Sequence, residues 1–165
     1  MPERIREVIA DTSPLRYLHQ VELLELLPTL YGSVTLPQAV AEELANGRAR
    51  EVDVPDPALC PWMQVRPVGA PFLALPRAMG PGEQAALTLA SRTPNSLLLL
   101  DDGLARRQAR LLGIAFTGTL GVLLKARDGG HLTAIAPVLD RLEELRFRLH
   151  PRTRAAVLKL AGEAS

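Results

Sequence analysis

Short apolar runs alternate along the chain with longer stretches in which apolar residues recur at helical spacing. The apolar runs predict strands, the last two of them core strands, at residues 5–10, 33–36, 96–100 and 114–116. Helical spacing predicts helices at residues 15–27 (two short helices), 37–45, 83–90, 102–112, 119–127, 132–146 and 151–162. Apolar strands that alternate with helices are typical of a parallel sheet covered on both faces. We therefore predict an α/β fold.

Residues with strong conformational preferences mark several helix ends. Ser13 is predicted to cap the helix that Pro14 then opens, since serine is a good cap and proline suits the first helical position. Pro37 opens the next helix, and Asn46-Gly47 is predicted to close it. Gly113 ends the helix that begins at the acidic pair Asp101-Asp102.

The stretch from residue 48 to residue 81 differs from its flanks. It contains seven prolines and little periodicity, and only residues 63–68 are strand-like. We interpret it as a surface excursion, pinned to the body by Cys60 and Trp62 and not a domain boundary, because its flanks need each other to build a core. The chain is thus expected to form one domain over 1–165, with a helical extension at about 151–165.

Composition restricts the class of protein. Hydrophobic residues make up 47% of the chain and charged residues 22%, as in globular proteins. The longest apolar runs are about four or five residues, far below the roughly 20 of a membrane span, and the N-terminus lacks a signal-peptide pattern. A soluble, cytoplasmic protein without membrane contacts is expected. With a net charge of +1, any phosphate-binding surface must be a local patch.

Carboxylates follow two of the predicted strands. Asp11 follows the first strand, and Asp101-Asp102 follow the strand at 96–100. In a parallel sheet these positions meet at one edge if the strands are neighbours. Clustered carboxylates repel one another unless a cation neutralises them, and hard oxygen ligands suit Mg²⁺ or Mn²⁺. The pattern indicates metal-assisted hydrolysis of a phosphodiester.

Each of these acids also has a purely structural interpretation. Asp11 could cap a helix, although Ser13 is better placed, and one of Asp101-Asp102 is expected to be a cap. Glu83 is a first-turn helix acid, and Glu42 and Glu43 lie on an amphipathic helix where glutamates are usually solvated. Arg106, one turn after Asp102, could pair with that carboxylate or reach a substrate phosphate.

Other chemistries fit the sequence less well. The histidines at 19, 131 and 150 lack ligand spacing, so we expect surface or core roles for them. If Asp11 were the nucleophile of a phosphatase, a second acid would be expected two residues later, but that residue is Ser13. A receiver-type phosphoacceptor domain requires a lysine at a strand end, but Lys125 lies inside a predicted helix.

Five sequence blocks together resemble a known family. In order, they are VIADTSPL, LPQAVAEEL, GPGEQAALTLA, LLLLDDGLARRQARLLGI and FTGTLGVLLKARDGG. They resemble the successive blocks of a prokaryotic group of PIN-domain proteins related to the VapC ribonuclease toxins. The resemblance covers roughly residues 7 to 150. The first block alone is weak, whereas LDDxxAR followed at the right distance by GTLG is much more specific.

This resemblance implies a three-layer α/β/α sandwich and a metal-dependent nuclease centre. The four family acids match Asp11, Glu43, Glu83 and Asp102 as catalytic residues, and the implied metal ligands are Asp11, Glu83, Asp101 and Asp102. Ser13, Arg106 and Thr119 are the candidates for substrate contact, with helix capping as the alternative for Thr119. The third acid is Glu where the toxins more often have Asp, and the 48–81 stretch is longer than in compact toxins.

The expected function is an Mg²⁺- or Mn²⁺-dependent endoribonuclease. It fits the toxin of a toxin–antitoxin pair, held silent by a small antitoxin protein. The alternative is a catalytically weak PIN-fold module that binds nucleic acid or protein. The leucine-rich residues 15–30 could bury their side chains against a second copy, as in related toxins, or in the chain's own core. Of the two, a homodimer is expected.

Overall fold

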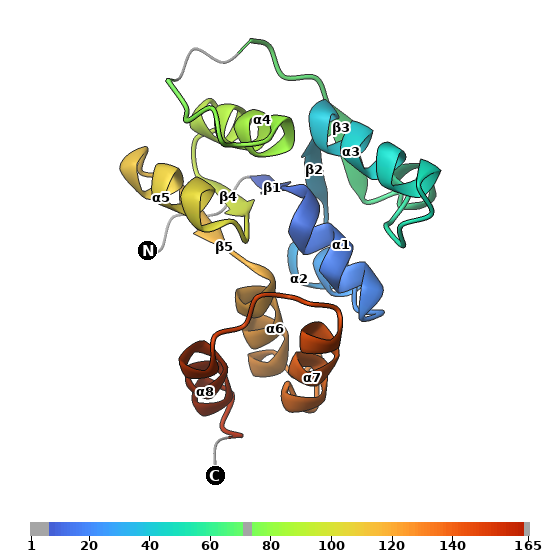
Figure 1. The fold of residues 1–165 in the computed structure, drawn as a ribbon, viewed down its shortest axis with the longest axis vertical. Coiled ribbons are helices and arrows are strands. Elements are labelled where there is room, and N and C mark those ends of the chain that lie inside the picture. Colours follow the sequence, from blue (N-terminus) through green and yellow to red (C-terminus); the bar gives the residue numbers. More distant parts are fainter. Residues whose placement is uncertain (1–6, 71–73, 164–165) are drawn as a thin grey trace.

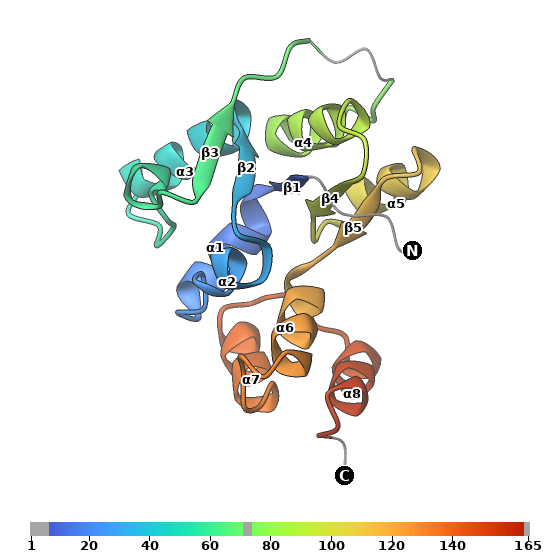
Figure 2. The ribbon, with the colours of Figure 1, turned by 180° about the vertical axis from the view of Figure 1, so that it is seen from behind.

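The computed structural model describes residues 7–70 and 74–163. Its single sheet has five strands, β1 (Glu7–Ala10), β2 (Val34–Pro37), β3 (Met63–Arg66), β4 (Ser96–Leu99) and β5 (Ala115–Thr117). All strand pairs are parallel, and the order across the sheet is β3-β2-β1-β4-β5, as seen in Figure 2. The predicted parallel sheet is confirmed, and the central strands β1 and β4 are neighbours.

Helices connect the strands and form the outer layers. They are α1 (Thr12–Gln20), α2 (Leu26–Tyr31), α3 (Gln38–Ala49), the short 3-10 helix η1 (Pro57–Leu59), α4 (Pro81–Ser91), α5 (Gly103–Leu111), α6 (Thr119–Asp128), α7 (Ala136–Glu144) and α8 (Pro151–Leu160). Residues 15–27 thus contribute to two short helices, as predicted. Within the described ranges, no helix has the length and apolar character that a membrane span requires.

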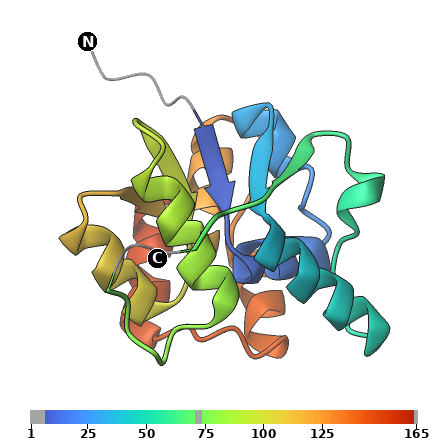
Figure 3. The same ribbon diagram turned by 90° about the horizontal axis from the view of Figure 1, so that it is seen from above.

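The sheet separates two apolar cores. On one face, Ile9, Leu98 and Leu100 pack with residues of α4 and α5. On the other face, Val8, Ala10 and Leu99 pack with residues of α1, α2, α6 and the C-terminal helices. Figures 1 and 3 show this arrangement, with α4 and α5 on one side and α6 to α8 on the other. The alternation of side chains along each strand therefore produces the predicted α/β/α sandwich.

Two predicted strands differ in the structure. The first strand begins at Glu7, and residues 5 and 6 of the predicted range lie outside the described residues. The strand predicted at 114–116 is β5, which pairs only with β4 and leaves Ala115 exposed. The prediction of a core strand there was wrong. Apolar content alone does not distinguish an edge strand from a central one, because an edge strand also packs one face against a helix.

The 48–81 stretch is more than a surface excursion. Its residues Met63–Arg66 form β3, which pairs with β2 in register from Val34↔Met63 to Pro37↔Arg66. Val54 and Met63 are buried in the core. The His19 ring is bonded at 2.9 Å to the Asp53 carboxylate, which ties the start of the stretch to α1. The strand-like character expected at 63–68 is thus confirmed for Met63–Arg66. The prolines around it are compatible with the edge position that this strand occupies.

Asn46-Gly47 does not close its helix. Helix α3 continues through both residues to Ala49, and Arg50 follows as its C-cap. A Cβ on Gly47 would lie 3.2 Å from a methyl carbon of Val54. Gly47 therefore allows the returning chain to pack closely on the helix, and this packing outweighs the weak helix propensity of glycine.

The leucine-rich stretch from 15 to 30 packs largely within this chain. Leu15, Leu18 and Leu27 are completely buried in the core on the α1 side of the sheet. The homodimer prediction rested on these leucines being available to a second copy. Leu23, Leu24 and Leu30 are only partly buried, so the homodimer stays a prediction that depends on these three.

Candidate active site at the carboxyl edge of the sheet

The carboxyl ends of β1 and β4 bring the strand-end acids together. Strand pairing runs from Glu7↔Ser96 to Ala10↔Leu99, and the Asp11 N–H then donates to the Leu99 carbonyl over 3.0 Å. Asp11 and the Asp101-Asp102 pair therefore leave neighbouring strands at the same edge. This convergence was predicted from the sequence, on the condition that the two strands were adjacent.

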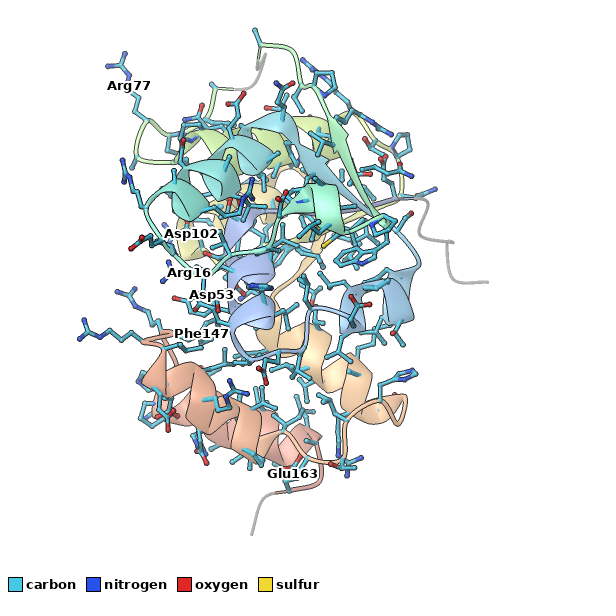
Figure 4. All side chains as sticks on the ribbon, turned by 90° about the vertical axis from the view of Figure 1, so that its right-hand side faces the viewer. Arg16, Asp53, Arg77, Asp102, Phe147 and Glu163 are labelled. Carbon is cyan, nitrogen blue, oxygen red and sulfur yellow. The ribbon has the colours of Figure 1, made fainter. Side chains whose placement is uncertain are left out.

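An open cavity of about 390 Å³ lies at this edge. Its walls come from α1, the N-termini of α4 and α5, and the chain between α7 and α8, and its lining residues are Ser13, Tyr17, Glu83, Asp101, Asp102, Gly103, Phe147 and Arg148. Figure 4 shows Asp102 and Phe147 on the same side of the molecule as Arg16 of α1. Ser13, predicted to contact substrate, thus borders the same space as three of the predicted acids.

Asp11 is the most buried of these acids, with 4% of its surface exposed. Its Oδ1 is buried and has no hydrogen-bond partner. Burial raises the pKa of Asp11 from 3.8 to about 7; the neighbouring Thr12 amide opposes this, and the charges of Glu83, Glu43 and Asp101 add to it. A buried carboxylate among other acids, with an unpartnered oxygen, is costly for folding, which makes Asp11 a candidate functional residue.

The predicted capping role of Ser13 is wrong. Helix α1 begins at Thr12, so that Asp11 occupies the N-cap position and Ser13 lies in the first turn. The Asp11 side chain nevertheless makes no capping hydrogen bond. Asp11 therefore has the backbone position of a cap while its carboxylate remains available for another purpose.

Glu43 is held in place by two other elements. One of its oxygens accepts a short hydrogen bond from the Thr12 hydroxyl, and the other accepts the Gly82 N–H over 3.0 Å. A Cβ on Gly82 would lie 2.6 Å from the Glu43 carboxylate, so glycine is needed for this approach. Of the two candidate glutamates, Glu43 faces the cluster, whereas Glu42 is exposed and bonds to Gln38 at 3.4 Å.

Glu83 lies in the first turn of α4, as predicted. One oxygen accepts the Gly80 N–H over 3.1 Å and so caps the helix. Burial raises the pKa of Glu83; the Gly80 bond partly offsets this, and the charges of Asp102 and Glu43 add to the rise. Glu83 makes no second hydrogen bond within the described residues, so its other oxygen is available to a ligand.

Asp101 and Asp102 have different partners. Both oxygens of Asp101 accept hydrogen bonds from Thr119, one from its N–H and one from its hydroxyl, each at 2.7 Å. Burial raises the pKa of the Asp101 carboxyl, against the lowering effect of these bonds and of Arg106. Thr119 is fully buried, and its two hydrogen bonds hold the Asp101 carboxylate in place.

Asp102 is the N-cap of α5, as expected for one member of the pair. Its Oδ2 accepts the Ala105 N–H over 2.9 Å, and no further hydrogen bond to it is formed within the described residues. The alternative that Arg106 pairs with Asp102 is not realised. The Arg106 guanidinium lies over the Phe116 ring, 5.0 Å from its centroid.

Gly118 makes room for Asp101. A Cβ at this position would lie 2.6 Å from Asp101 Oδ1 and 3.3 Å from the Leu100 carbonyl oxygen. We therefore expect Gly118→Ala to displace Asp101 from Thr119 and to lower the free energy of unfolding by about 1–3 kcal/mol. Gly103→Ala is the matched control, because a Cβ on Gly103 meets no atom within 4 Å. Urea denaturation measures both, and equal stabilities would contradict the expected clash.

Several residues around the cavity were not found from the sequence. Thr12 and Gly82 hold Glu43, and Tyr17, Phe147 and Arg148 line the cavity. The glycine beside Glu83 was a possible signal, because a glycine in a helical first turn often permits a close approach. No sequence signal pointed to Phe147 and Arg148, since they lie in no motif. They border the site only because of the way the chain runs between the C-terminal helices.

A larger cavity, of about 480 Å³, lies near the opposite end of the strands and contains Glu7 and Arg66. These two charges pair at 2.9 Å, and Thr35 donates to the same Glu7 oxygen at 2.7 Å. This cavity has no carboxylate without a partner. The buried carboxylate oxygen without a partner, Asp11 Oδ1, belongs to the carboxyl edge instead.

The residues at the carboxyl edge fit a divalent cation by their chemistry. They are hard oxygen donors, and the unpartnered Asp11 Oδ1 among mutually repelling carboxylates is the kind of atom that a cation satisfies. In residues 7–70 and 74–163, no three His, Cys, Asp or Glu side chains already form a group that could hold a metal. The available oxygens belong to Asp11, Glu83 and Asp102, whereas those of Asp101 and Glu43 are taken up within the protein.

Comparison with known proteins gives one result. A family model described as a PIN domain matches residues 7–163. No curated protein and no solved structure shows a significant match to the chain.

Proposed function

Because the chain belongs to the PIN-domain family, whose members are generally nucleases, we propose that it is a metal-dependent ribonuclease that hydrolyses RNA phosphodiester bonds. The observation that carries this proposal is the buried Asp11 carboxylate, with its unpartnered oxygen, at an edge where Glu83 and Asp102 also have free oxygens. Such a cluster is suited to hold Mg²⁺ or Mn²⁺ against a phosphate. When bound, the cation would activate water and stabilise the leaving oxygen.

The acids divide into two groups in this proposal. Asp11, Glu83 and Asp102 are the ligands, since each has an oxygen that no protein group occupies. Asp101 and Glu43 are positioning residues: Asp101 joins the end of β4 to α6 through Thr119, and Glu43 joins α3 to α1 and α4 through Thr12 and Gly82. Their hydrogen bonds fix the backbone from which the ligands project.

Aromatic and cationic groups complete the cavity. Tyr17 and Phe147 meet edge to face, with ring centroids 4.9 Å apart, and offer apolar surface against which a base could stack. Arg148 adds a positive charge to a wall otherwise dominated by carboxylates. Single-stranded RNA, with unstacked bases and a charged backbone, matches this combination.

The test is cleavage of labelled RNA by wild-type protein with Mg²⁺ or Mn²⁺, and with EDTA. We expect Asp102→Asn to reduce the cleavage rate about a hundredfold, because it loses a charged ligand. Stability should change by less than about 0.5 kcal/mol, because asparagine is an equally good N-cap. Asp128→Asn, at the far end of α6, is the matched control and should cleave normally.

Two outcomes contradict the proposal. Cleavage that persists in EDTA excludes a metal-dependent reaction. A wild-type protein that cleaves no RNA in either metal favours the alternative of a PIN-fold binding module. The finer proposal, a toxin silenced by an antitoxin protein, is supported by the resemblance to VapC toxins alone. A gene for a small partner protein beside this one would strengthen it.

A further inference from the structure

A second cavity adjoins the acidic one. It has a volume of about 260 Å³, and its lining residues are Asp101, Arg106, Gly118, Leu120, Gly121, Phe147, Arg148, His150 and Thr153. Asp101, Phe147 and Arg148 line both cavities. The two spaces are therefore neighbours, and the 145–150 segment between α7 and α8 borders both. We call the second space the cationic cavity.

The charges of the two cavities are opposite. The acidic cavity contains Glu83, Asp101 and Asp102 against the single cation Arg148. In the cationic cavity the only acid is Asp101, whose oxygens are both occupied by Thr119. Its remaining polar groups include two arginines and a histidine. One space is thus suited to a metal cation and the other to an anion.

Apart from the long-range attraction between Arg106 and Asp101, the cations of this cavity have no anionic neighbour among the described residues that binds them directly. Neither Arg106 nor Arg148 forms a hydrogen bond or ion pair within the described part of the chain, and Arg106 Nε is buried without a partner. His150 Nδ1 accepts the Arg152 N–H over 3.1 Å, so the neutral ring carries its proton on Nε2 and can donate it. Two arginines at one cavity repel each other unless an anion lies between them.

A hydrogen bond and a ring contact hold the 145–150 segment in place. Arg146 adopts a left-handed conformation with φ of 65°, and the Phe147 N–H donates to the Leu142 carbonyl over 2.9 Å, which ends α7 and turns the chain. The Phe147 ring then packs on Tyr17 of α1. Arg148 is therefore anchored beside the acidic cavity by its neighbour, and Figure 1 shows the segment passing over the start of α6.

We propose that the cationic cavity binds the backbone phosphate of the nucleotide next to the scissile bond, through Arg106, Arg148 and His150. The proposal rests on the ribonuclease function proposed above. Arginine binds phosphate with two parallel hydrogen bonds, and here two arginines have their donors free. A polyanion that passes from one cavity to the other must pass Arg148, which borders both. A carboxylate-bearing peptide has no group that suits the acidic cavity in the same way.

The experiment measures binding of a labelled single-stranded oligouridine in EDTA, over a range of salt concentrations. Without metal the acids repel RNA, so binding must come from the cationic side. We expect Arg148→Gln and Arg106→Gln each to weaken binding about tenfold, as for a lost hydrogen bond to a charged group. The slope of log affinity against log salt should fall by about 0.7 for each phosphate contact removed. Arg148→Lys should keep most of the slope.

Arg146→Gln is the matched control. Arg146 belongs to the same exposed segment but lines neither cavity. Wild-type affinity and slope in both Arg148→Gln and Arg106→Gln, or an equal loss in Arg146→Gln, would overturn the proposal, as would a wild-type protein that binds no oligouridine. If the wild type cleaves RNA while Arg148→Gln binds normally, only the phosphate site fails. If the wild type does not cleave but Arg148→Gln loses affinity, the hydrolysis fails and the site stands.

Discussion

Asp11→Asn is expected to reduce metal-dependent RNA cleavage by at least about a hundredfold, while the protein remains folded. Asparagine has nearly the same shape, so the packing around this buried position is kept. It loses the negative charge that a divalent cation requires at the unpartnered Oδ1.

The measurement compares initial cleavage rates of Asp11→Asn, Asp128→Asn and wild type at saturating Mn²⁺. Thermal unfolding with and without Mn²⁺ gives a second readout that does not depend on activity. Mn²⁺ should raise the melting temperature of the wild type and of Asp128→Asn, but not that of Asp11→Asn. Cleavage by Asp11→Asn at the wild-type rate would remove Asp11 from the site.

The same substitution is expected to stabilise the metal-free protein at neutral and alkaline pH. The pKa of Asp11 is about 7 in the folded chain and 3.8 in the reference state. The folded state thus holds this proton more tightly, so the contribution of Asp11 to stability is fully present below pH 3.8 and is lost as the pH rises through 7. The loss is on the order of 4 kcal/mol at most.

Urea denaturation in EDTA, at intervals between pH 4 and pH 8.5, checks this expectation. The difference in free energy of unfolding between Asp11→Asn and wild type should increase in favour of the variant as the pH rises. Comparing the two proteins at each pH cancels the titration of the other acids. A difference independent of pH would mean that Asp11 is ionised at little cost. Together with lost cleavage, a stabilised variant would show that Asp11 is retained for function and not for folding.

The sequence by itself determined most of the helices and strands and the three acids at the strand ends. Apolar strands alternating with amphipathic helices permit only a parallel sheet with two covered faces, and strands such as Ser96–Leu99 show this directly. In such a sheet, Asp11 and Asp101-Asp102 must lie at the carboxyl edge. Local signals also placed Glu83 at a helix start, where it is found. These conclusions depend on hydrophobic periodicity and on the preferences of residues for helix ends, and both can be recognised in the sequence alone.

Tertiary structure decided which acids have free oxygens. Both oxygens of Asp101 accept hydrogen bonds from Thr119, which is distant in sequence and is the first residue of α6. The two oxygens of Glu43 likewise accept hydrogen bonds, from Thr12 and from Gly82. No sequence spacing reports such long-range hydrogen bonds, so the sequence alone left the choice between Asp101 and Asp102 open.

The C-terminal contribution to the site also required the fold. Phe147 and Arg148 belong to no motif and follow a helix whose own pattern indicates only packing. Phe147 and Arg148 lie near the acids because α7 ends in a left-handed turn at Arg146 and because the Phe147 ring packs on Tyr17 of α1. Short-range preferences therefore determine the elements and the edge at which the carboxylates gather. Contacts between distant segments determine which of those carboxylates remain free and which cations accompany them.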